Sequence, residues 1–393
     1  MSLVVDIEKD LAGFSLDVSF RVDDAREVMG LLGASGCGKS MTLKCIAGVV
    51  TPDCGHIELD GRVLFDSESR VDVPARDRRV GYLFQDYALF PNMDVLHNVM
   101  AGVRSRDAAE RRRVAMGQIR AFRLEGLERL RPAQLSGGQR QRVAIARIMG
   151  SDPDLLLLDE PFSALDGYLR WQLELELSDT LREFGRPTVF VSHSRDEVYR
   201  LCDTVCVVSS GTSEPKLTVP QLFSAPDTLS AALISGCKNV SRARPVGRGL
   251  LACDDWGVTL RASREVAPDA THVGIRAHYL RVVSVGEGLA GPSAAPGTVA
   301  GDGVAEAEVA AADAGGNLIG CVVDRVIDST FSTIVMLATP GGARLRHELE
   351  KDEWAALESR GARPGGRLTI AVDPSAVMPL RDVTGVAPGD GTS

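Results

Sequence analysis

The sequence Leu-Ser-Gly-Gly-Gln-Arg at residues 135–140, followed by Leu-Leu-Leu-Leu-Asp-Glu-Pro at residues 155–161, decides the fold of this chain. Four consecutive leucines predict a short strand that is buried on both faces, as in a parallel sheet. Such a strand delivers the carboxylates of Asp159 and Glu160 at its end. The Ser-Gly-Gly-Gln stretch precedes an arginine-rich helical pattern, so its hydroxyl and amides are expected at the positive end of a helix.

A glycine-rich loop upstream matches the pattern GxxxxGK[ST] of phosphate-binding loops. The apolar run 28–32 leads into it and a helical pattern over 40–49 follows, which is the context that such a loop requires. Backbone amides and the helix end then face the phosphates, the lysine reaches the β and γ phosphates, and the serine ligates magnesium. The loop consists of Gly33, Ala34, Ser35, Gly36, Cys37, Gly38, Lys39 and Ser40.

The three motifs, in this order, resemble the nucleotide-binding subunit of an ABC transporter. The resemblance implies an α/β fold: a P-loop ATPase domain with a mixed sheet and a helical subdomain, and ATP and Mg²⁺ as cofactors. It implies that Ser40 and Asp159 hold magnesium and that Glu160 is the catalytic base that polarises the attacking water. His193, after an apolar strand, is expected against the γ-phosphate, and Gln85 matches a glutamine that senses magnesium, water and the membrane partner.

The resemblance also implies a dimer of two copies of the chain with two composite ATP sites. In the family, the element that corresponds to Ser136, Gly137, Gly138 and Gln139 grips the γ-phosphate bound to the opposite subunit. Asp166 belongs to a loop that crosses the same interface. A second copy of the ATPase subunit is therefore an expected partner.

Two positions near the phosphate loop are less typical. Met41 stands where the family usually has a hydroxyl residue, so only its backbone is expected to contact the nucleotide. Phe14 is a candidate for the aromatic ring on which adenine stacks, and a place in the core is an equally ordinary fate for it.

Composition limits the classes of partner and compartment. The chain has 393 residues and a formal net charge of −9, which argues against a nucleic-acid partner. No basic segment with an apolar core opens the sequence and no apolar run could span a bilayer, so we expect a soluble chain that reaches a membrane through a partner. The eight cysteines lack paired CxxC spacing, which suits a reduced cytoplasm and predicts neither a zinc site nor a disulfide framework.

Changes in composition predict the domain organisation. A polar connector with prolines at 215, 220 and 226 follows the ATPase motifs, and short strands separated by Gly and Pro dominate after it. This all-β part resembles the OB-like TOBE/MOP β-barrel regulatory region of importer ATPases. The expected ranges are 1–213 for the ATPase domain, about 86–150 for its helical subdomain, 214–236 for the linker, 237–380 for the barrel region in two lobes that break at about 286–303, and 381–393 for a flexible tail.

The start of the all-β region, residues 235–242, is similar to the start of molybdate-binding barrel domains. A small oxyanion needs amides, hydroxyls and a cation, so Lys238, Asn239 and Ser241 are candidates to bind one. The alternative is that this segment is only the first strand and turn of a packed barrel.

The leading interpretation is the ATPase subunit of an importer for a small solute, with molybdate or tungstate first and sulfate next. Polyamine, iron or sugar import is the alternative, and a soluble ABC ATPase of DNA repair or translation, or a P-loop kinase or GTPase, ranks below. The implied partners are transmembrane permease subunits and, indirectly, an extracytoplasmic solute-binding protein, at the cytoplasmic face of the cell membrane. Tyr87, Phe90, Pro91 and Met93 lie where the membrane subunit docks in the family that the motifs resemble, and burial in the helical lobe is an equally ordinary fate for them.

Overall fold

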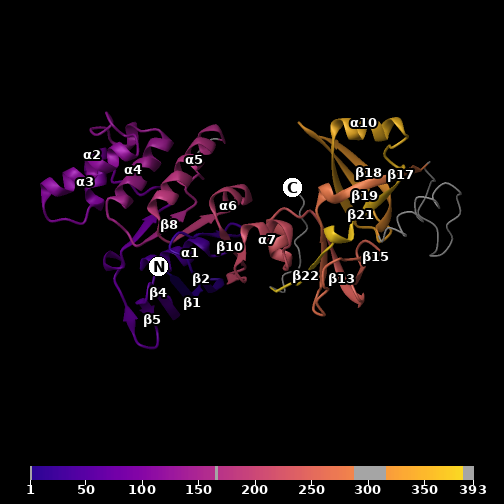
Figure 1. Cartoon of the computed structure of the whole chain (residues 1–393), viewed down its shortest axis with the longest axis horizontal. Coiled ribbons are helices and arrows are strands. Elements are labelled where there is room, and N and C mark those ends of the chain that lie inside the picture. The colour runs from indigo at the N-terminus through magenta and orange to yellow at the C-terminus, as the bar shows by residue number, and fades with distance from the viewer. Residues whose placement is uncertain (1, 164–166, 287–315, 384–393) are drawn as a thin grey trace. The chain divides into compact units, whose positions relative to one another are not determined.

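The computed structural model describes residues 2–163, 167–286 and 316–383. By its internal contacts the chain forms two compact units, residues 1–221 and 222–393 (Figure 1). The first unit is built on a mixed sheet with helices, and the second on antiparallel sheets. This agrees with the predicted succession of an α/β domain and an all-β region.

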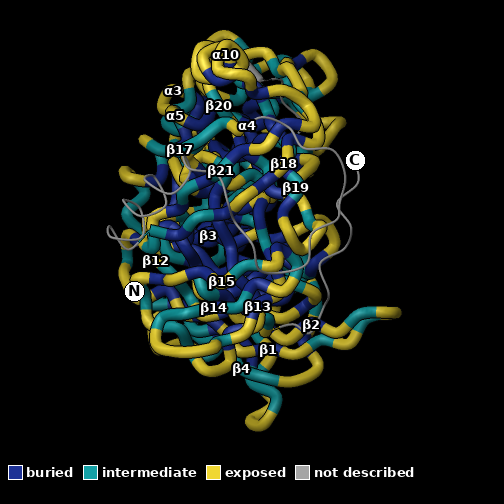
Figure 2. Tube along the Cα trace, turned by 90° about the vertical axis from the view of Figure 1, so that its right-hand side faces the viewer, coloured by how far each residue is buried: buried dark blue, intermediate teal, exposed yellow. Residues whose placement is uncertain are grey.

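The centre of the first unit is a set of parallel strands in the order β10-β3-β9-β8-β7. Every residue of β3, β8 and β9 is buried, which explains their unbroken apolar sequences; β3 is dark blue in Figure 2. The bounds are β3 (Val28–Leu32), β7 (Val80–Leu83), β8 (Leu155–Asp159), β9 (Thr188–Ser192) and β10 (Thr204–Ser209).

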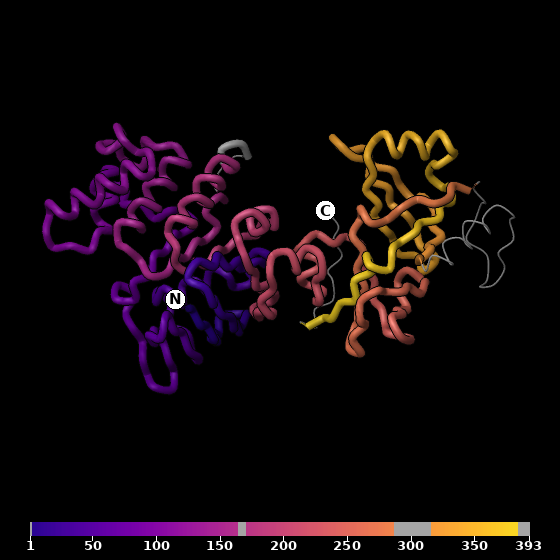
Figure 3. Tube along the Cα trace, in the orientation of Figure 1, coloured from indigo at the N-terminus to yellow at the C-terminus, as the bar shows by residue number. Residues whose placement is uncertain are grey.

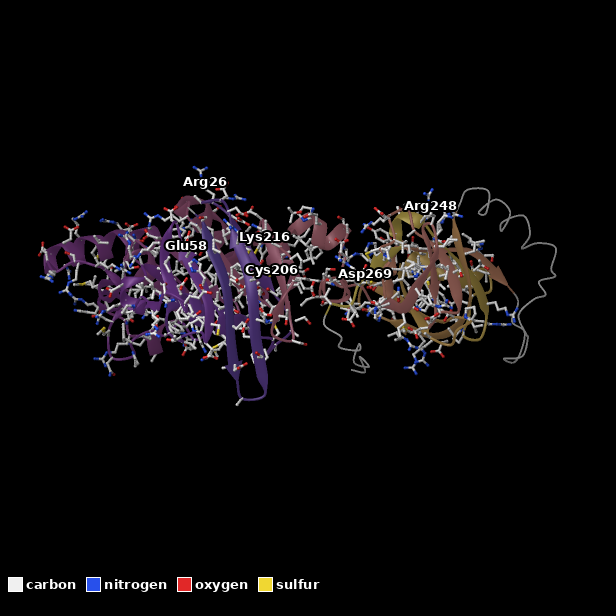
Figure 4. All side chains as sticks on the ribbon, turned by 90° about the horizontal axis from the view of Figure 1, so that it is seen from below. Arg26, Glu58, Cys206, Lys216, Arg248 and Asp269 are labelled. Carbon is white, nitrogen blue, oxygen red and sulfur yellow. The ribbon has the colours of Figure 1, made fainter. Side chains whose placement is uncertain are left out.

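An antiparallel portion extends this sheet in the order β6-β5-β4-β1-β2, and β11 joins β2 to β10. β1 and β2 alternate buried and exposed residues, as their sequences predict. Lys216, beyond β11, pairs with Asp23 at 2.8 Å and Glu27 at 3.1 Å; Figure 4 labels it near Cys206 of β10. The bounds are β1 (Leu3–Leu11), β2 (Phe14–Val22), β4 (Cys54–Leu59), β5 (Arg62–Asp66), β6 (Val71–Asp72), β11 (Thr212–Ser213) and β12 (Leu217–Thr218).

Helices of the first unit fall into two groups. α1 (Lys39–Ala47) follows β3 and leads to β4, whereas α5 (Gly167–Phe184) connects β8 to β9 and α6 (Arg195–Leu201) connects β9 to β10. α2, α3 and α4 pack on one another around an apolar cluster of their own and form one bundle in the trace of Figure 3. This helical lobe contains α2 (Val95–Gly102), α3 (Ala108–Ala121) and α4 (Gly137–Met149), and the 3-10 turn η2 (Pro132–Gln134) precedes α4. A second 3-10 turn, η1 (Ala75–Asp77), lies outside the lobe and precedes β7.

Arg78, after η1, is fully buried and closes the end of α1. Its guanidinium donates to the carbonyls of Cys45 at 2.8 Å, Ile46 at 2.9 Å and Val73 at 2.7 Å, and pairs with Asp72 at 2.9 Å. The last carbonyls of a helix lack partners within its regular ladder, and Arg78 donates to two of them; the Cys45 carbonyl also accepts the N–H of Gly48 at 3.1 Å. The helix that carries the phosphate loop is thereby fixed at its far end.

The described residues of the second unit form two antiparallel five-stranded sheets, in the orders β15-β14-β13-β16-β22 and β17-β21-β18-β19-β20. A shared core includes the fully buried Trp256. Arg248, in the turn between β13 and β14, is exposed and points outward in Figure 4. The bounds are β13 (Asn239–Gly247), β14 (Leu250–Cys253), β15 (Val258–Arg261), β16 (His272–Ile275), β17 (Leu280–Gly286), β18 (Asn317–Asp328), β19 (Ser332–Ala338), β20 (Arg344–Glu350), β21 (Arg367–Val372), β22 (Met378–Leu380), η3 (Ala277–Tyr279), η4 (Pro374–Ala376) and α10 (Lys351–Ser359).

The segment expected as a linker carries regular structure. β12, α7 (Val219–Ser224) and α8 (Leu229–Ile234) lie within or across residues 214–236. Pro220 stands in the first turn of α7, where its missing N–H has no helical partner to lose. The proline signals therefore mark short helices here. Most of the expected break at 286–303 and of the expected tail lies outside the described residues.

Candidate functional site

The predicted motif residues follow the carboxyl ends of neighbouring parallel strands. The phosphate loop follows β3, Asp159 ends β8 with Glu160 after it, His193 follows β9, and Gln85 lies two residues beyond β7. Because these strands are parallel neighbours, their carboxyl ends meet at one edge of the sheet. Ligands of open α/β sheets bind at this edge.

The phosphate loop has a compact geometry that depends on two glycines. A Cβ at Gly33 would lie 2.3 Å from the carbonyl oxygen of Val208, and Gly38 caps α1 with φ of +107°. Lys39 is only 4% exposed, and its ammonium donates to the carbonyls of Gly33 and Ala34, both at 2.8 Å. The loop therefore curls around its own lysine and points the start of α1 at the site.

Ser40 and Asp159 meet where the fold family places magnesium. The Ser40 hydroxyl donates to Asp159 Oδ1 at 2.8 Å, and the Tyr82 hydroxyl donates to Oδ2 at 2.9 Å. Burial raises the pKa of Asp159, while these two hydrogen bonds oppose the shift. A hydroxyl and a carboxylate are the hard oxygen donors that Mg²⁺ takes beside phosphates and water, so the residues fit the ion. The sequence did not single out Tyr82; an aromatic hydroxyl on the strand that precedes Gln85 was its only signal.

Glu160 and His193 face each other across the ends of β8 and β9. Glu160 Oε1 lies 3.3 Å from His193 Nδ1, with the Glu160 side chain 17% exposed and the histidine 51% exposed. Glu160 has φ of +45°, an uncommon backbone conformation for a non-glycine residue and one that clusters at functional sites. The carboxylate is thus held at the rim of the site and not in the core.

The turn that carries His193 is braced by residues that sequence reasoning missed. Ser192 donates to Glu197 at 2.7 Å and accepts the amide of Ser194 at 2.8 Å. Glu197 is 4% exposed, and burial raises its pKa. The spacing from Ser194 to Glu197 fits the capping pattern S/T-x-x-E, which could have revealed this brace.

The Ser-Gly-Gly-Gln motif forms the N-terminus of α4, which begins at Gly137. Ser136 Oγ accepts the backbone N–H of Gln139 at 3.3 Å, and Gln139 Oε1 accepts the backbone N–H of Ser136 at 2.9 Å. This reciprocal pair is a capping box. Ser136 is exposed and Gly138 is buried. Because the hydroxyl already accepts a bond, its proton is the part that an incoming anion can use.

The other predicted nucleotide contacts are placed less closely. Gln85 is exposed, and Met41 is partly buried against the core. A Cβ at Gly38 would lie 2.9 Å from Phe14 Cζ, so the Phe14 ring borders the phosphate loop. Asp166 lies outside the described residues.

The candidate oxyanion residues do not present a common set of free groups. Lys238 is exposed, whereas Asn239 and Ser241 are buried. The side-chain NH2 of Asn239 donates to the backbone carbonyl of Arg346 at 2.9 Å, and its side-chain oxygen accepts the backbone N–H of Arg346. Both the donor and the acceptor of this side chain are therefore used within the unit. The Ser241 hydroxyl donates to the Arg242 carbonyl at 2.8 Å. These contacts favour the alternative of a packed first strand.

A cavity of about 610 Å³ opens on the helical lobe. Met93, which is 40% exposed, lines it; Phe90, three residues earlier in the chain, is 45% exposed, and Pro91 is exposed as well. Tyr87, in contrast, is 4% exposed. The lining residues are Asn92, Met93, Asp94, His97, Met100, Ala101, Arg111, Arg129 and Arg131.

Comparison with known proteins places this arrangement in a family. The ABC transporter family model matches residues 16–163. A solved dimeric structure of the ATP-binding cassette MJ0796, bound to ADP and Pi, is similar with 26% identity and a TM-score of 0.48, over 56% of this chain and 99% of that one. Within the part of the chain that the structure describes, no helix is both long and apolar enough to span a bilayer.

Three curated relatives share the import function but differ in solute. The "Molybdenum import ATP-binding protein ModC" of Paramagnetospirillum magneticum is 37% identical over 70% of this chain and 77% of its own length. A "Sulfate/thiosulfate import ATP-binding protein CysA 1" of Rhizobium meliloti is 37% identical over 76% and 86%. A "Spermidine/putrescine import ATP-binding protein PotA" of Nitratidesulfovibrio vulgaris is 40% identical over 66% and 72%. The chain therefore belongs to the family of import ATP-binding proteins of ABC transporters, which are ATPases coupled to transport.

Proposed function

We propose that the sheet edge described above is the ATP site and that its motif residues act in the roles that their places suggest. The observation that carries this proposal is the convergence of Lys39, Ser40, Asp159, Glu160 and His193 at the ends of three adjacent parallel strands. The loop amides and Lys39 bind the phosphates, and Phe14 offers the adenine a ring. Ser40, Asp159 and Gln85 hold the magnesium, which when bound neutralises phosphate charge.

Hydrolysis in this proposal depends on a water held between Glu160 and the γ-phosphate. Glu160 accepts the proton of that water, and His193, 3.3 Å away, orients the carboxylate and contacts the γ-phosphate. The positive φ of Glu160 turns its carboxylate out of the strand toward the rim. Asp159, buried and bonded by two hydroxyls, stays in place as a metal ligand.

The active form is a two-fold dimer in which each Ser136–Gln139 helix end meets the nucleotide of the other copy. The exposed Ser136 hydroxyl and the N-terminal end of α4 can together bind an anion, which supports a contact with a phosphate of the second copy. Asp166 would lie in the loop at the interface. Two composite sites then close together around two ATP molecules.

A permease pair is the membrane partner, and it places the chain at the cytoplasmic face of the membrane. The cavity on the helical lobe, with exposed Phe90, Pro91 and Met93 at hand, supports docking of a permease segment there. Closure of the dimer would move these lobes and so drive alternate access. A solute-binding protein outside the membrane acts through the permease, and no nucleic acid is involved.

Replacing Ser136 with arginine tests the composite site. We expect the purified Ser136→Arg protein to bind ATP as the parent does and to lose hydrolysis by about 100-fold or more, because the arginine blocks the helix end that must meet the partner's phosphate. Ser69→Arg, an equal change on an exposed turn of the same unit, is the control. Unchanged turnover in Ser136→Arg would rule out the composite site.

The solute that we propose is a small oxyanion, molybdate or tungstate first and sulfate next. Of the three relatives described above, those named for molybdenum and for sulfate or thiosulfate import match 70% and 76% of this chain, and the one named for spermidine and putrescine import matches 66%. A thermal-shift titration of the full chain with molybdate, tungstate, sulfate, phosphate and spermidine checks whether the second unit binds solute, since a ligand of the folded state raises the melting temperature. A shift with spermidine alone would favour polyamine import, which is the alternative.

A further inference from the structure

The segment that follows Gln85 has a strained backbone. Tyr87 and Ala88 are consecutive non-glycine residues with φ of +64° and +42°. L-residues visit this left-handed region rarely, and each such residue costs of order 1 kcal/mol unless its surroundings hold it. Two in succession therefore require contacts that fix this conformation.

Arg147, near the end of α4, supplies these contacts. Its guanidinium donates to the carbonyl of Tyr87 at 3.0 Å and to that of Ala88 at 2.7 Å, and it lies over the ring of Phe90 at 5.4 Å. No carboxylate pairs with Arg147 among the described residues, and its pKa is lowered by burial alone. A desolvated cation thus uses its planar fork on two backbone carbonyls.

The side chain of Tyr87 connects the same segment to the catalytic strand end. Tyr87 is 4% exposed, and its hydroxyl donates to the carbonyl of Pro161 at 3.2 Å. Pro161 directly follows Glu160. Tyr87 therefore contacts both sides: its backbone carbonyl accepts a hydrogen bond from Arg147, and its side-chain hydroxyl donates to the backbone next to Glu160, the proposed base.

A second helix holds the remainder of the segment. Asn98 of α2 is fully buried; its amide accepts the N–H of Phe90 at 2.8 Å and donates to the carbonyls of Phe90, Met93 and Asp94. A Cβ on Gly102, the last residue of α2, would lie 2.0 Å from the carbonyl oxygen of Arg147, so the two helices touch at this point. The segment is clamped onto the helical lobe along its length.

We propose that Arg147 is a positioning residue that couples α4 to Gln85 and to the Pro161 end of the catalytic strand. α4 carries Ser136 at one end and Arg147 near the other, and a helix of 13 residues moves as a rigid rod. A displacement of the Ser136 end on meeting the partner's nucleotide is then passed to the segment after Gln85. This inference rests on the proposed roles of Gln85, Glu160 and Ser136.

The test compares Arg147→Met and Arg147→Lys with the parent chain. Methionine removes the fork, and lysine keeps the charge but cannot span both carbonyls. We expect turnover to fall ~10- to 100-fold in Arg147→Met with the KM for ATP changed less than twofold, because misplacing catalytic groups by about 1 Å has such effects on rate. Lysine is expected to restore little of the turnover, and amide hydrogen exchange over residues 85–94 should accelerate in both variants.

Two comparisons keep the outcome interpretable. Arg142→Met removes another arginine of α4, one that grips Glu176 at 2.8 and 2.9 Å, and should leave exchange over residues 85–94 unchanged. Tyr87→Phe removes only the hydroxyl bonded to Pro161 and keeps Arg147 in place. It should lower turnover, though less than Arg147→Met does, and so it provides a second test if Arg147→Met folds poorly. Parent-like turnover and exchange in the Arg147 variants would overturn the inference; a parent chain that does not hydrolyse ATP would instead overturn the proposed function.

Discussion

The two units use buried and half-buried polar residues in opposite ways. In the first, the polar residues of the site stand just beyond parallel strands, where neighbouring loops bring them together around space for a ligand. In the second, polar side chains lie within antiparallel sheets and bond to the backbone of the same unit. In this molecule, the edge where parallel strands end leaves functional groups available to a ligand, whereas the antiparallel sheets use their polar side chains for internal hydrogen bonds.

Three clamps illustrate the second case. Asn239 bonds both backbone groups of Arg346, and Asn317 bonds both backbone groups of Arg261. Arg276 is 7% exposed and donates to the carbonyl and hydroxyl oxygens of Ser235. Each of these side chains therefore spends its hydrogen-bonding groups on residues of the same unit. A polar residue in a strand of this unit is therefore weak evidence for a binding site.

The largest effect should come from Glu160→Gln in the first unit. We expect hydrolysis to fall ~10²- to 10⁴-fold, because the amide cannot accept the proton of the attacking water. ATP binding and closure should persist, so the variant with ATP and magnesium should elute as a dimer in size-exclusion chromatography. The control in the second unit is Glu348→Gln, a change at an exposed ion pair with Arg346, which should hydrolyse ATP as the parent does. A Glu160→Gln protein that stays monomeric would falsify the trapped dimer.

Arg78→Met should produce the next largest effect, on stability. The change removes the guanidinium from the carbonyls of Ile46 and Val73 and leaves the Cys45 carbonyl with the Gly48 N–H alone, so we expect a loss of about 3 kcal/mol in the free energy of unfolding of the first unit. Arg76→Met, whose side chain is 85% exposed, should change it by less than about 0.5 kcal/mol. Hydrogen exchange of the full chain reports each unit separately, and faster exchange in the second unit instead would contradict this assignment.

Asn239→Ala tests whether the second unit contains a clamp or a binding site. A clamp predicts a loss of about 1–3 kcal/mol, with faster exchange around Arg346 and unchanged ATP turnover. Asn317→Ala, which breaks an equivalent pair with Arg261, should behave alike. If Asn239→Ala keeps its stability and loses a molybdate-induced thermal shift that Asn317→Ala retains, the binding-site interpretation of Asn239 is restored.

The smallest effect is a pH dependence of opposite sign in the two units. A hydrogen bond with Asp66 raises the pKa of His56 in the folded first unit. Protonated His56 therefore adds to the free energy of unfolding of that unit; the addition is complete below the unfolded pKa of about 6.5 and is lost as pH rises through the folded pKa. Burial lowers the pKa of His347 and of His272, so the stability of the second unit is full above about pH 6.5 and falls as pH drops below it.

Exchange protection of the full chain between pH 7.5 and 5.5, corrected for intrinsic rates, measures this contrast. We expect protection in the second unit to decrease over that range of about two pH units, and His347→Gln to weaken the decrease. His56→Gln is the matched change in the first unit and should leave the response of the second unit intact. Equal responses of both units in the parent would refute the assignment.

Local motifs made much of the first unit predictable. The phosphate loop, β3, β8 and β9 were expected because a continuous apolar strand followed by polar residues is encoded in a few adjacent positions. Strands β4–β7 were not predicted, since they are short and their pairing partners are distant in sequence. Tyr82 and Arg78 were missed for a related reason: their importance arises from contacts with Asp159 and α1, which only the fold creates.

The second unit shows what a resemblance in sequence leaves undetermined about side-chain contacts. Its all-β character followed from the Gly- and Pro-separated strands, but the choice of Lys238, Asn239 and Ser241 as ligands used a resemblance and side-chain type, without the contacts of these residues. Alternation along β13 buries Asn239 and Ser241 on one face, with Lys238 exposed, and the amide of Asn239 finds its partner 107 residues away. No local pattern announces a partner at that separation.

The internal bonds of Lys39 have a kinetic consequence. The ammonium is buried and bonded to two carbonyls of its own loop, so the positive charge is already desolvated before a nucleotide arrives. The approaching polyphosphate therefore meets a fixed electric field, and capture exchanges carbonyl bonds for phosphate bonds with little rearrangement of the chain. Association of ATP should then slow as ionic strength rises, while the dissociation rate, set by the exchanged bonds, responds much less.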